Sequence, residues 1–548
     1  MGRLSKRVIN QVKKTESKKK RQTMKKNLFK TRLLSFAAFC GLALAFASCA
    51  NEDVAQGTTG TESDNDKNLT TFVAGDEAKT RTSMDYTTGN FFWEAGDYIY
   101  VKDDDGTWQQ SSNAPTGRVA SFKFKVPGKF KNSTTYKVYY PGKNGSNDQV
   151  TIPAAQTQAT PNTTNHFGES GDCGTADASK QSNGSFAFAL DHQAAILVFQ
   201  PYTSNTVLKD CYLTKVEVTS DNDITHTYTL DPTTGELTGT GSGKQIILTT
   251  KGSGSYANGF SLNTTSASLA TNGAYMVIKP GTHILRVRYW VKDIATNVEG
   301  TITKLLSSHT YAKNTYYDMT ANLNVRDYDG MYYMWDAQQN YWSGHEWNSA
   351  NPWQPTLTSQ SANLNYAQSN ADPNNRWYHE GGGSGRLDAT NSCAICPNAN
   401  EISWYVKYGD PRWDGDELWT TMGHLYKGGM WFKKKSVLQG EHHYDTDKSA
   451  DGSTDLRTIS IGYSNSSSTI NSGLPSVADA GNYFYLPVLG QYDSGQLNGV
   501  GSYGYYWSSS AYPWDSTAAY NLFFSSGLVY VGGYGSHRGY GFRAWAFE

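Results

Sequence analysis

The chain has 548 residues, and its 37 Tyr, 15 Trp and 53 Gly are typical of β-rich domains with aromatic, loop-rich surfaces. Its net charge is only −1, but residues 1–48 hold 13 Lys and Arg and one Glu, which leaves 35 basic and 48 acidic residues downstream, a net charge of −13. Such an acidic chain is a poor ligand for nucleic acid or an anionic membrane surface, so we expect no nucleic-acid partner.

The first predicted element is a secretory signal that ends at Cys49. The apolar run LLSFAAFCGLALAFASC at 33–49 follows four basic residues within 25–32, the arrangement of a lipoprotein signal peptide whose terminal cysteine becomes lipid-modified. A transmembrane helix is the alternative, but roughly 16 apolar residues are short for a span. Residues 1–48 are thus a basic extension plus a signal peptide, with translation starting at Met1 or Met24.

Residues 49–69 form a Gly-, Thr- and Ser-rich tether with several acidic residues soon after the cysteine. This stretch resembles the export signal that sends lipoproteins of Bacteroides-type bacteria to the outer face of the outer membrane. The resemblance implies a protein that is anchored in the outer membrane by lipid and exposed at the cell surface. The alternative is an ordinary solvated linker, because acidic Gly/Ser-rich segments stay extended and soluble whatever their role.

From residue 70 to 328 short runs alternate apolar and polar residues and end at Gly, Asn, Asp or Pro, the pattern of β-strands. No long helical period interrupts these runs, so we predict two β-sandwiches, 70–202 and 203–328. The predicted strands lie at 70–74, 91–101, 121–126, 135–140, 186–191, 194–199, 215–219, 226–230, 245–250, 274–279 and 284–293.

Several spaced motifs in this segment resemble the fimbrillin-like proteins of type V pili. They are Thr80-Arg-Thr-Ser, Phe92-Trp-Glu-Ala-Gly-Asp-Tyr-Ile, Tyr136-Lys-Val-Tyr-Tyr-Pro, Leu190-Asp-His-Gln-Ala-Ala-Ile-Leu-Val-Phe and Tyr316-Tyr-Asp-Met-Thr-Ala-Asn-Leu. The resemblance implies transthyretin-like sandwiches, proteolytic removal of a first strand after a basic residue, and its replacement by a strand of another pilin subunit. Arg81 is the expected processing site, Lys79 is a second candidate, and an unprocessed solvated residue is the alternative.

Residues 329–548 carry a second series of aromatic and glycine-rich motifs. They include Met331-Tyr-Tyr-Met-Trp-Asp, Gly409-Asp-Pro-Arg-Trp, Leu418-Trp-Thr-Thr-Met-Gly-His, Gly504-Tyr-Tyr-Trp-Ser-Ser-Ser and Arg538-Gly-Tyr-Gly-Phe-Arg. This series resembles the C-type-lectin-like domain of gut Bacteroides surface proteins, which is related in fold to formylglycine-generating enzymes. It implies an α+β ligand-binding domain, so the predicted fold class is mainly β, with two fimbrillin-like sandwiches followed by this domain.

Two short helices fit the C-terminal domain. One is predicted at 398–406, with Asn398 and Asn400 as candidate N-caps. The other is predicted at 414–425, a range in which Leu418, Met422 and Leu425 would share one helix face.

The sequence offers no convincing catalytic or metal-binding set. Nucleophile-elbow, HExxH, Walker and dinucleotide-binding motifs are absent from it. The segment Glu441–Asp447 gathers acids and histidines, but adjacent histidines on a loop point apart and the spacing of a calcium-binding EF-hand fails. We therefore predict no enzyme activity, no catalytic residues, no metal and no cofactor, with a surface enzyme that uses Glu441–Asp447 as the alternative.

The cysteines and lectin signatures are equally weak signals for chemistry. Cys393 and Cys396 form a lone CxxC, which cannot complete a zinc site, so a local disulfide or two free thiols are expected. A formylglycine-generating role would need a cysteine pair near the C-terminus, and no cysteine follows Cys396. Of the calcium-lectin signatures only a partial echo is present, at Asp372-Pro-Asn374.

The expected ligand surface lies within 490–540, where Tyr, Ser, Gly and Asn match the composition of antibody contact loops. Lectin-fold proteins of this kind are common targets of diversity-generating retroelements, which randomise adenines. Randomised Asn codons cannot encode Lys, Gln, Glu, Met or Trp, and the segment Tyr530–Gly541 contains none of these residues. A glycine-rich β-loop explains their absence equally well. The predicted ligand-binding residues are Tyr503, Tyr505, Tyr512, Asp515, Tyr530, Tyr534, Ser536, His537 and Tyr540.

These features together predict a surface lipoprotein adhesin at the tip of a pilus. The lectin-like framework runs to Glu548 and leaves no strand to donate, so the subunit is expected to end a filament. Its partners would be other pilin subunits, joined by donor-strand exchange, and a host, bacterial or glycan ligand. The alternative is a stand-alone surface lipoprotein that binds a glycan or a protein without joining a pilus.

Overall fold

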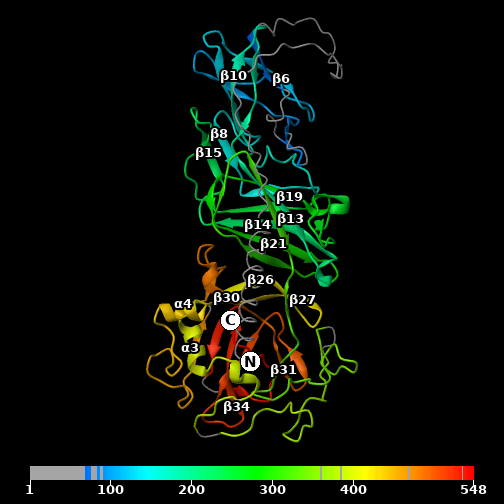
Figure 1. Ribbon diagram of the computed structural model, residues 1–548, viewed down its shortest axis with the longest axis vertical. Coiled ribbons are helices and arrows are strands. Elements are labelled where there is room, and N and C mark those ends of the chain that lie inside the picture. The colour runs from blue at the N-terminus through cyan, green and yellow to red at the C-terminus, as the bar shows by residue number, and fades with distance from the viewer. Residues whose placement is uncertain are drawn as a thin grey trace, which may run out of the picture. The chain divides into compact units, whose positions relative to one another are not determined.

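The computed structural model describes residues 68–75, 83–86, 91–357, 361–382, 385–466, 470–532 and 535–548. Strands predominate among them and helices are few and short, which confirms the predicted mainly β fold class (Figure 1). Each strand predicted between residues 70 and 293 overlaps an observed strand. The predictions for Cys49, Arg81 and Tyr534 fall outside the described residues.

The chain divides into two compact units. Of the described residues, unit 1 comprises those within 68–202, 214–283 and 307–322, and unit 2 those within 203–213, 284–306 and 323–548. The first change of unit falls between residues 202 and 203. The predicted segment 203–328 is shared between the two units.

The largest sheet of unit 1 has the first described strand in its interior. Its order is β5 (Trp108–Gln110), β4 (Tyr100–Lys102), β7 (Thr135–Tyr140), β10 (Gly174–Lys180), β11 (Phe186–Phe188), β1 (Leu69–Ala74) and β6 (Phe122–Pro127), with β12 (Asp191–His192) paired to β10. β1 runs antiparallel to β6 over its whole length and parallel to β11. Because side chains alternate along a strand, Phe72 and Ala74 are buried in the core while Thr71 is only half-buried.

A three-stranded sheet forms a second part of the unit 1 core. β13 (Ala195–Tyr202) lies between β19 (Ala274–Ile278) and β24 (Thr315–Asn322). All residues of β13 but Tyr202 are buried, which agrees with its unbroken apolar run because a strand covered on both faces needs no alternation. Figure 1 shows β13 and β19 as adjacent green strands.

Shorter elements complete unit 1. Apart from the long strand β14 (Cys211–Ser220), they are β2 (Ser83–Met84), β3 (Phe91–Phe92), β8 (Gln149–Ile152), β9 (Ala155–Thr157), β15 (His226–Leu230), β16 (Leu237–Thr238), β17 (Gln245–Thr249), β18 (Phe260–Ser261), α2 (Leu269–Asn272), β20 (Gly281–His283) and β23 (His309–Tyr311). β14 begins within the part of the chain that belongs to unit 2.

Unit 2 contains two main sheets and a hairpin. The first sheet has the order β30 (Tyr483–Pro487), β27 (His424–Lys433), β26 (Arg412–Thr421), β22 (Glu299–Leu305) and β21 (Leu285–Asp293), with β25 (Arg326–Tyr328) and β29 (Asn471–Ser472) also paired to β26. The second has the order β28 (Tyr463–Ser466), β35 (Leu528–Val531), β34 (Ala518–Ser525) and β33 (Gly504–Ala511), with β36 (Ser536–His537) on β34. The hairpin joins β31 (Gln491–Asp493) to β32 (Gln496–Asn498).

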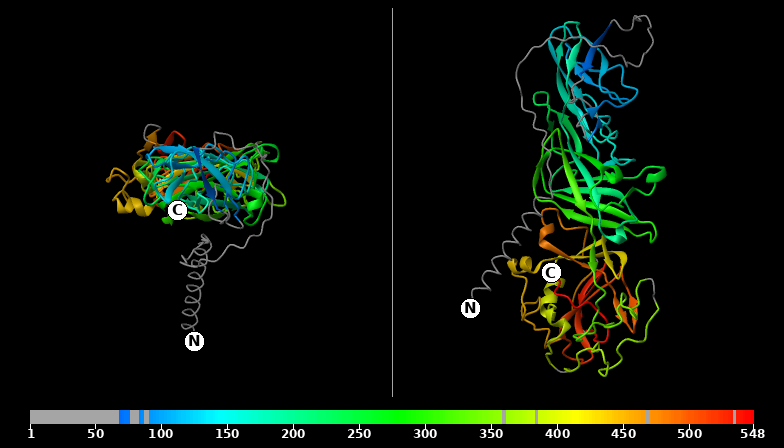
Figure 2. Two further views of the ribbon diagram at one scale, coloured as in Figure 1. Left: turned by 90° about the horizontal axis from the view of Figure 1, so that it is seen from above. Right: turned by 45° about the vertical axis from the view of Figure 1, so that its right-hand side comes forward.

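Two helices pack beside these strands. α3 (Ala399–Tyr408) contacts β28, β33, β34 and β35, and α4 (Lys435–Gly440) follows β27. In Figure 1 and in the right-hand view of Figure 2 the yellow helix α3 lies beside the red C-terminal strands. Among the residues that the structure describes, none of the helices has the length and apolarity that crossing a bilayer requires.

The helix predicted at 398–406 is confirmed, and the one predicted at 414–425 is wrong. Residues 412–433 form the hairpin of β26 and β27 instead, and Thr421 pairs with His424 across a two-residue turn. Both turn residues, Met422 and Gly423, have positive φ, which gives the turn the twist that antiparallel strands favour.

The N-terminus of α3 is fixed by a capping box. The Asn398 side chain accepts a hydrogen bond from the Glu401 backbone N–H (3.0 Å), and Glu401 accepts one from the Asn398 N–H (2.8 Å). We expect Asn398→Ala to lower the free energy of unfolding of unit 2 by about 1 kcal/mol, because a capped N–H loses its acceptor. Chemical denaturation measures this loss. Asn263→Ala, at an exposed position, is the control, and equal stability of the two variants would contradict the assignment.

Candidate functional site

Four predicted ligand-binding residues belong to a series of ring contacts at the surface of unit 2, which we call the aromatic face. The ring centroids are 6.3 Å apart for Tyr503–Tyr505, 4.9 Å for Tyr505–Phe542, 5.9 Å for Phe542–Tyr540, 5.8 Å for Tyr540–His537, 6.0 Å for His537–Tyr378 and 4.4 Å for Tyr378–Trp377. Phe542 is buried beneath the others, whereas Tyr503 is 43% exposed and His537 is exposed. The aromatic face therefore offers rings to solvent on a packed base.

A pocket of about 140 Å³ opens on the aromatic face. Its walls include the rings of Tyr366, Trp377 and Tyr540. Polar groups of Gln368, Asp493, Ser494 and His537 line the same pocket. The combination of rings with a few polar groups is typical of a small-ligand subsite.

The segment that carries His537 and Tyr540 is fixed by Arg538, whose side chain is fully buried. Its Nε donates to the carbonyl of Ala518 (2.9 Å), and its Nη1 donates to the carbonyls of His379 (3.0 Å) and Gly381 (2.9 Å). The guanidinium also lies 4.5 Å from the centre of the Trp335 ring. Burial lowers the pKa of Arg538, and these acceptors and the ring compensate for its lost hydration.

A tight hairpin places Asp493 and Ser494 at the pocket. Ser494 (φ 49°) and Gly495 (φ 77°) form its two-residue turn, in which positive φ at both positions matches the twist of β31 and β32. The Gly495 N–H donates to the hydroxyl of Tyr341 (3.3 Å), and the Asn363 N–H donates to the Gly495 carbonyl (3.0 Å). The turn is therefore bound to the core on both sides.

Asp372, the partial echo of a calcium-lectin signature, holds an arginine. The Arg376 Nη2 and Nε donate to its carboxylate at 2.7 and 3.2 Å, and the Arg376 Nη1 donates to the carbonyl of Asn365 (3.1 Å). Burial alone would raise the pKa of Asp372, but the hydrogen bonds and charge of Arg376 lower it below its usual value. This pair fixes the segment 365–377, which contributes Tyr366, Gln368 and Trp377 to the pocket.

Trp377 is oriented by a carboxylate at its edge. Its Nε1 donates to Glu380 (2.8 Å), and the same carboxylate accepts a hydrogen bond from the Asn370 side chain (3.0 Å). The polar end of the indole is thus engaged, which leaves the ring face for the pocket.

The other predicted ligand-binding residues lie apart from the pocket. Tyr512 is buried, and its hydroxyl is 2.7 Å from that of Ser460. Asp515 is exposed and accepts hydrogen bonds from the Thr517 N–H and hydroxyl, both at 2.8 Å. Two further residues lie on strands, Tyr530 half-buried on β35 and Ser536, whose hydroxyl donates to the Asn521 side chain (2.9 Å), on β36.

Sequence reasoning missed the contribution of the segment 366–380. Its signal was weak, because Tyr366, Trp377 and Tyr378 are spread among polar residues without a strand or helix period. The aspartate and arginine four residues apart, Asp372 and Arg376, were a usable sign of a fixed loop.

The segment Glu441–Asp447 is engaged in structural contacts. Glu441 pairs with Lys433 (2.6 Å), and the His443 ring stacks on Tyr408 at 4.0 Å. Asp445 accepts hydrogen bonds from the Asp447 (2.7 Å) and Lys448 (3.1 Å) N–H groups. Within the ranges that the structure describes, no three side chains among His, Cys, Asp and Glu gather so that they could hold a metal ion.

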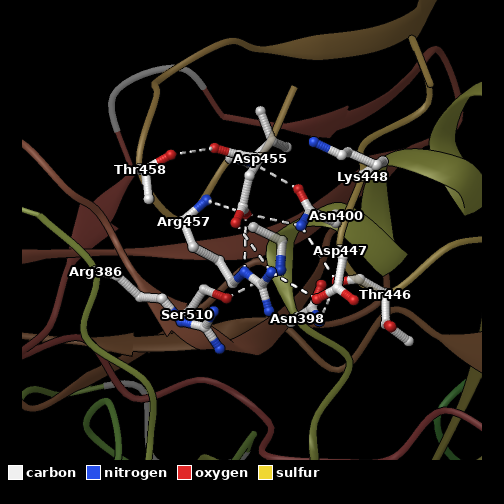
Figure 3. A network of polar contacts seen from close by, with 12 residues as sticks. Arg386, Asn398, Asn400, Thr446, Asp447, Lys448, Asp455, Arg457, Thr458 and Ser510 are labelled. Atoms are coloured by element: carbon white, nitrogen blue, oxygen red, sulfur yellow. Dashed lines mark hydrogen bonds and ion pairs between the residues drawn. The ribbon is translucent and has the colours of Figure 1, made fainter. Parts of the chain in front are cut away.

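Figure 3 shows how the following loop is fixed to α3. The Arg457 guanidinium donates to Asp455 (2.8 and 2.9 Å) and to Asp447 (2.9 Å). Asn400 of α3 donates to Asp455 (2.9 Å) and accepts from the Leu456 N–H (2.8 Å). Burial alone would raise the pKa of Asp455, but the hydrogen bonds from Arg457 and Asn400 lower it to about 2. The hydrogen bonds to Asp455 and Asp447 raise the pKa of Arg457, although burial opposes them. The arginine and the aspartate therefore both stay charged at neutral pH.

The four cysteines among the described residues are buried free thiols, namely Cys173, Cys211, Cys393 and Cys396. Of the two outcomes expected for the CxxC, the structure therefore has the thiols. Cys393 lies beside Asp336, whose backbone N–H donates to its Sγ at 3.1 Å. Burial raises the pKa of Cys393 well above its ordinary value, which disfavours the reactive thiolate.

Comparisons with known proteins found only distant likenesses. No family model matches the chain, and no curated protein matches it. Among solved structures, the chain is similar to a candidate cell adhesion protein from Bacteroides ovatus ATCC 8483, with 14% identity and a TM-score of 0.29, over 46% of this chain and 92% of that one. It is also similar to a candidate cell adhesion protein from Bacteroides uniformis ATCC 8492, with 16% identity and a TM-score of 0.27, over 46% of this chain and 93% of that one. It is also similar to a fimbrial protein from Bacteroides ovatus ATCC 8483, with 10% identity and a TM-score of 0.23. That match covers 85% of this chain and 99% of the fimbrial protein. The TM-scores of these three structures all lie below 0.5.

Proposed function

We propose that this chain is a surface-exposed lipoprotein adhesin that binds its ligand through the aromatic face of unit 2. The observation that carries the proposal is the pocket beside Trp377 and Tyr540, where rings and polar groups converge. Rings supply contact area at little conformational cost, and a few polar groups fix the orientation of a ligand. In this proposal the chain binds without catalysis and uses no metal or cofactor.

The size of the pocket favours one small part of a larger ligand. Its volume of about 140 Å³ is well below the roughly 300 Å³ at which pockets for whole drug-sized ligands begin. A terminal sugar ring or a single side chain of a host or bacterial surface molecule fits this volume. The remaining contact would come from the exposed rings of Tyr503 and His537 on the aromatic face.

Loss of two pocket rings is expected to abolish most binding. We predict that Trp377→Ala combined with Tyr540→Ala weakens binding by about 30-fold or more, because buried aromatic anchors carry much of the energy of an interface. The measurement is binding of the purified chain to an array of glycans and cell-surface proteins. Tyr98→Ala, an exposed tyrosine in unit 1, is the control. An unchanged array profile of the double variant would count against the proposal.

We also propose that β1 gives way to a donor strand of another pilin subunit, which would place this chain in a pilus, at its tip. The support is topological, since β1 lies between β6 and β11 and its departure would leave two unpaired strand edges with an apolar groove between them. Cleavage after Arg81 would release β1 from the rest of the chain.

The stand-alone lipoprotein has an observation in its favour as well. β1 pairs with β6 along its whole length. The largest sheet of unit 1 therefore holds this strand from its own chain and needs no strand from another subunit. The two candidates separate when the chain is treated with an arginine-specific protease and mixed with pilin subunits. A detergent-resistant complex of higher mass supports the pilus, and a monomer under all conditions supports the stand-alone protein.

The proposed anchor at Cys49 is tested on cells. We expect radioactive palmitate to label the wild-type chain and not Cys49→Ser, and protease added to intact cells to degrade the labelled chain. Labelled chain that resists added protease while a known surface protein is degraded would contradict surface exposure.

A further inference from the structure

A second pocket, of about 210 Å³, lies in unit 2 where β22 meets β26. β22 runs parallel to β26 and pairs with it at Thr301 and Glu417. The pocket shares no lining residue with the pocket of the aromatic face. It is therefore a separate place at which a ligand could bind.

Aromatic rings form one wall of this second pocket. Trp431 and Tyr485 have ring centroids 5.1 Å apart, and Trp419 lines the pocket beside them. The Trp431 Nε1 donates to Asp414 (3.2 Å), and the Trp419 Nε1 donates to the carbonyl of Gly428 (2.9 Å). Since the polar ends of both indoles are engaged, the buried Trp419 serves as the base of the wall, and the half-buried Trp431 presents its apolar surface to a ligand.

Two cations line the same pocket, and neither forms an ion pair with a residue that the structure describes. The side-chain nitrogens of Lys304 and Arg326 lie more than 4.0 Å from every carboxylate oxygen of the described residues. Burial lowers the pKa of Lys304, an effect that the charge of Glu417 opposes. The Arg326 guanidinium lies 5.0 Å from the Tyr328 ring and 4.9 Å from the Trp545 ring, which together hold it in place.

Glu417 is the acidic residue of this pocket, and its carboxylate oxygens accept hydrogen bonds from two residues of β22. It accepts hydrogen bonds from the Thr303 hydroxyl (2.6 Å) and N–H (3.1 Å) and from the Thr301 hydroxyl (3.1 Å). Burial, with the charge of Asp414 adding to it, raises the pKa of Glu417 to about 7. Near neutral pH the acid is therefore partly protonated and compensates only part of the positive charge.

We propose that this second pocket binds a single hydroxylated ring that carries a carboxylate, such as a hexuronate. Lys304 and Arg326 would pair with the ligand carboxylate, and the rings of Trp431 and Tyr485 would pack against its apolar face. The volume admits one ring and not a chain of rings.

The test is a titration of the purified chain with sodium glucuronate, followed by tryptophan fluorescence. Glucuronate should bind saturably, and glucose and acetate, which each lack one half of the ligand, should bind at least tenfold more weakly. Lys304→Gln and Arg326→Gln should each lower the affinity for glucuronate about tenfold, which is equivalent to about 1.4 kcal/mol of binding free energy. The exposed Lys407→Gln is the control, and melting temperatures establish that the variants fold.

Three outcomes overturn the proposal. One is the absence of saturable glucuronate binding, and another is binding that both variants leave unchanged. The third is an affinity for acetate equal to that for glucuronate, because the site would then be a nonspecific anion contact. None of these outcomes affects the aromatic face, because neither variant alters that pocket.

The affinity should also depend on pH. As pH falls from 8 to 6, protonation of Glu417 removes a negative charge beside the ligand carboxylate, so glucuronate should bind more tightly. Glu417→Gln should weaken this dependence, and an equally steep dependence in that variant would contradict the role of Glu417. The charged or titratable groups that interact with Glu417 from the surrounding strands are Arg288, Lys304, Tyr328, Asp414 and Tyr485, and Arg326 lines the same pocket.

Discussion

Arg538→Met is expected to lower the free energy of unfolding of unit 2 by about 4 kcal/mol, because charged hydrogen bonds and a cation–π contact are lost together. The fully buried guanidinium serves three carbonyl groups, those of Ala518, His379 and Gly381, and lies over the Trp335 ring. Methionine fills the space of the aliphatic stem but offers no donor, so the carbonyls stay buried without it.

Differential scanning calorimetry measures this loss as a fall in the melting temperature of about 10 °C for a unit of this size. Arg386→Met is the matched control, since Arg386 is exposed and pairs with Asp388 at the surface. An exposed pair of this kind contributes little to stability, so the control should melt close to wild type. A melting temperature of Arg538→Met within 1 °C of wild type, about the effect of a surface substitution, would refute the assigned role.

Phe72→Ala is expected to destabilise unit 1 by about 3–5 kcal/mol, the usual cost of truncating a buried phenylalanine. The Phe72 side chain is fully buried, stacks on Phe186 at 5.1 Å and meets Phe130 edge-on at 5.2 Å. Because β1 has only two fully buried side chains, those of Phe72 and Ala74, this ring supplies most of its attachment to the core.

Hydrogen exchange locates the effect of Phe72→Ala. Amides of β6 and β11 that pair with β1 should exchange faster, while those of β13 and β19 should change less. Thr71→Ala, which alters the neighbouring half-buried position, is the control. Uniform acceleration across unit 1 would contradict a strand that is released on its own, and a loss below 1 kcal/mol would contradict the packing argument.

The strands were predictable because their apolar periods and turn residues are local. Both β1 and β13 were predicted as short apolar-rich runs that end at turn residues, and both are strands. The helix predicted at 414–425 failed because Leu418, Met422 and Leu425 are spaced as on a helix by coincidence. The β-branched residues before Met422 and the glycine after it were the competing signal of a hairpin, and the hairpin is what the structure has.

The candidate site was only half visible in the sequence. The composition of the last residues indicated Tyr503, Tyr505, His537 and Tyr540, which the structure joins through ring contacts. The opposite wall comes from residues far away in the chain, and its position depends on buried polar contacts such as those of Arg376. Long-range contacts of this kind leave no periodic pattern.

The account depends most on the aromatic face being the surface that holds the ligand. Hydrogen exchange of the chain, with and without a ligand that the array identifies, tests this directly. We predict that binding slows exchange in 366–380, 491–495 and 536–540 and leaves the strands of unit 1 unchanged. Protection confined to other parts of the chain would contradict the account.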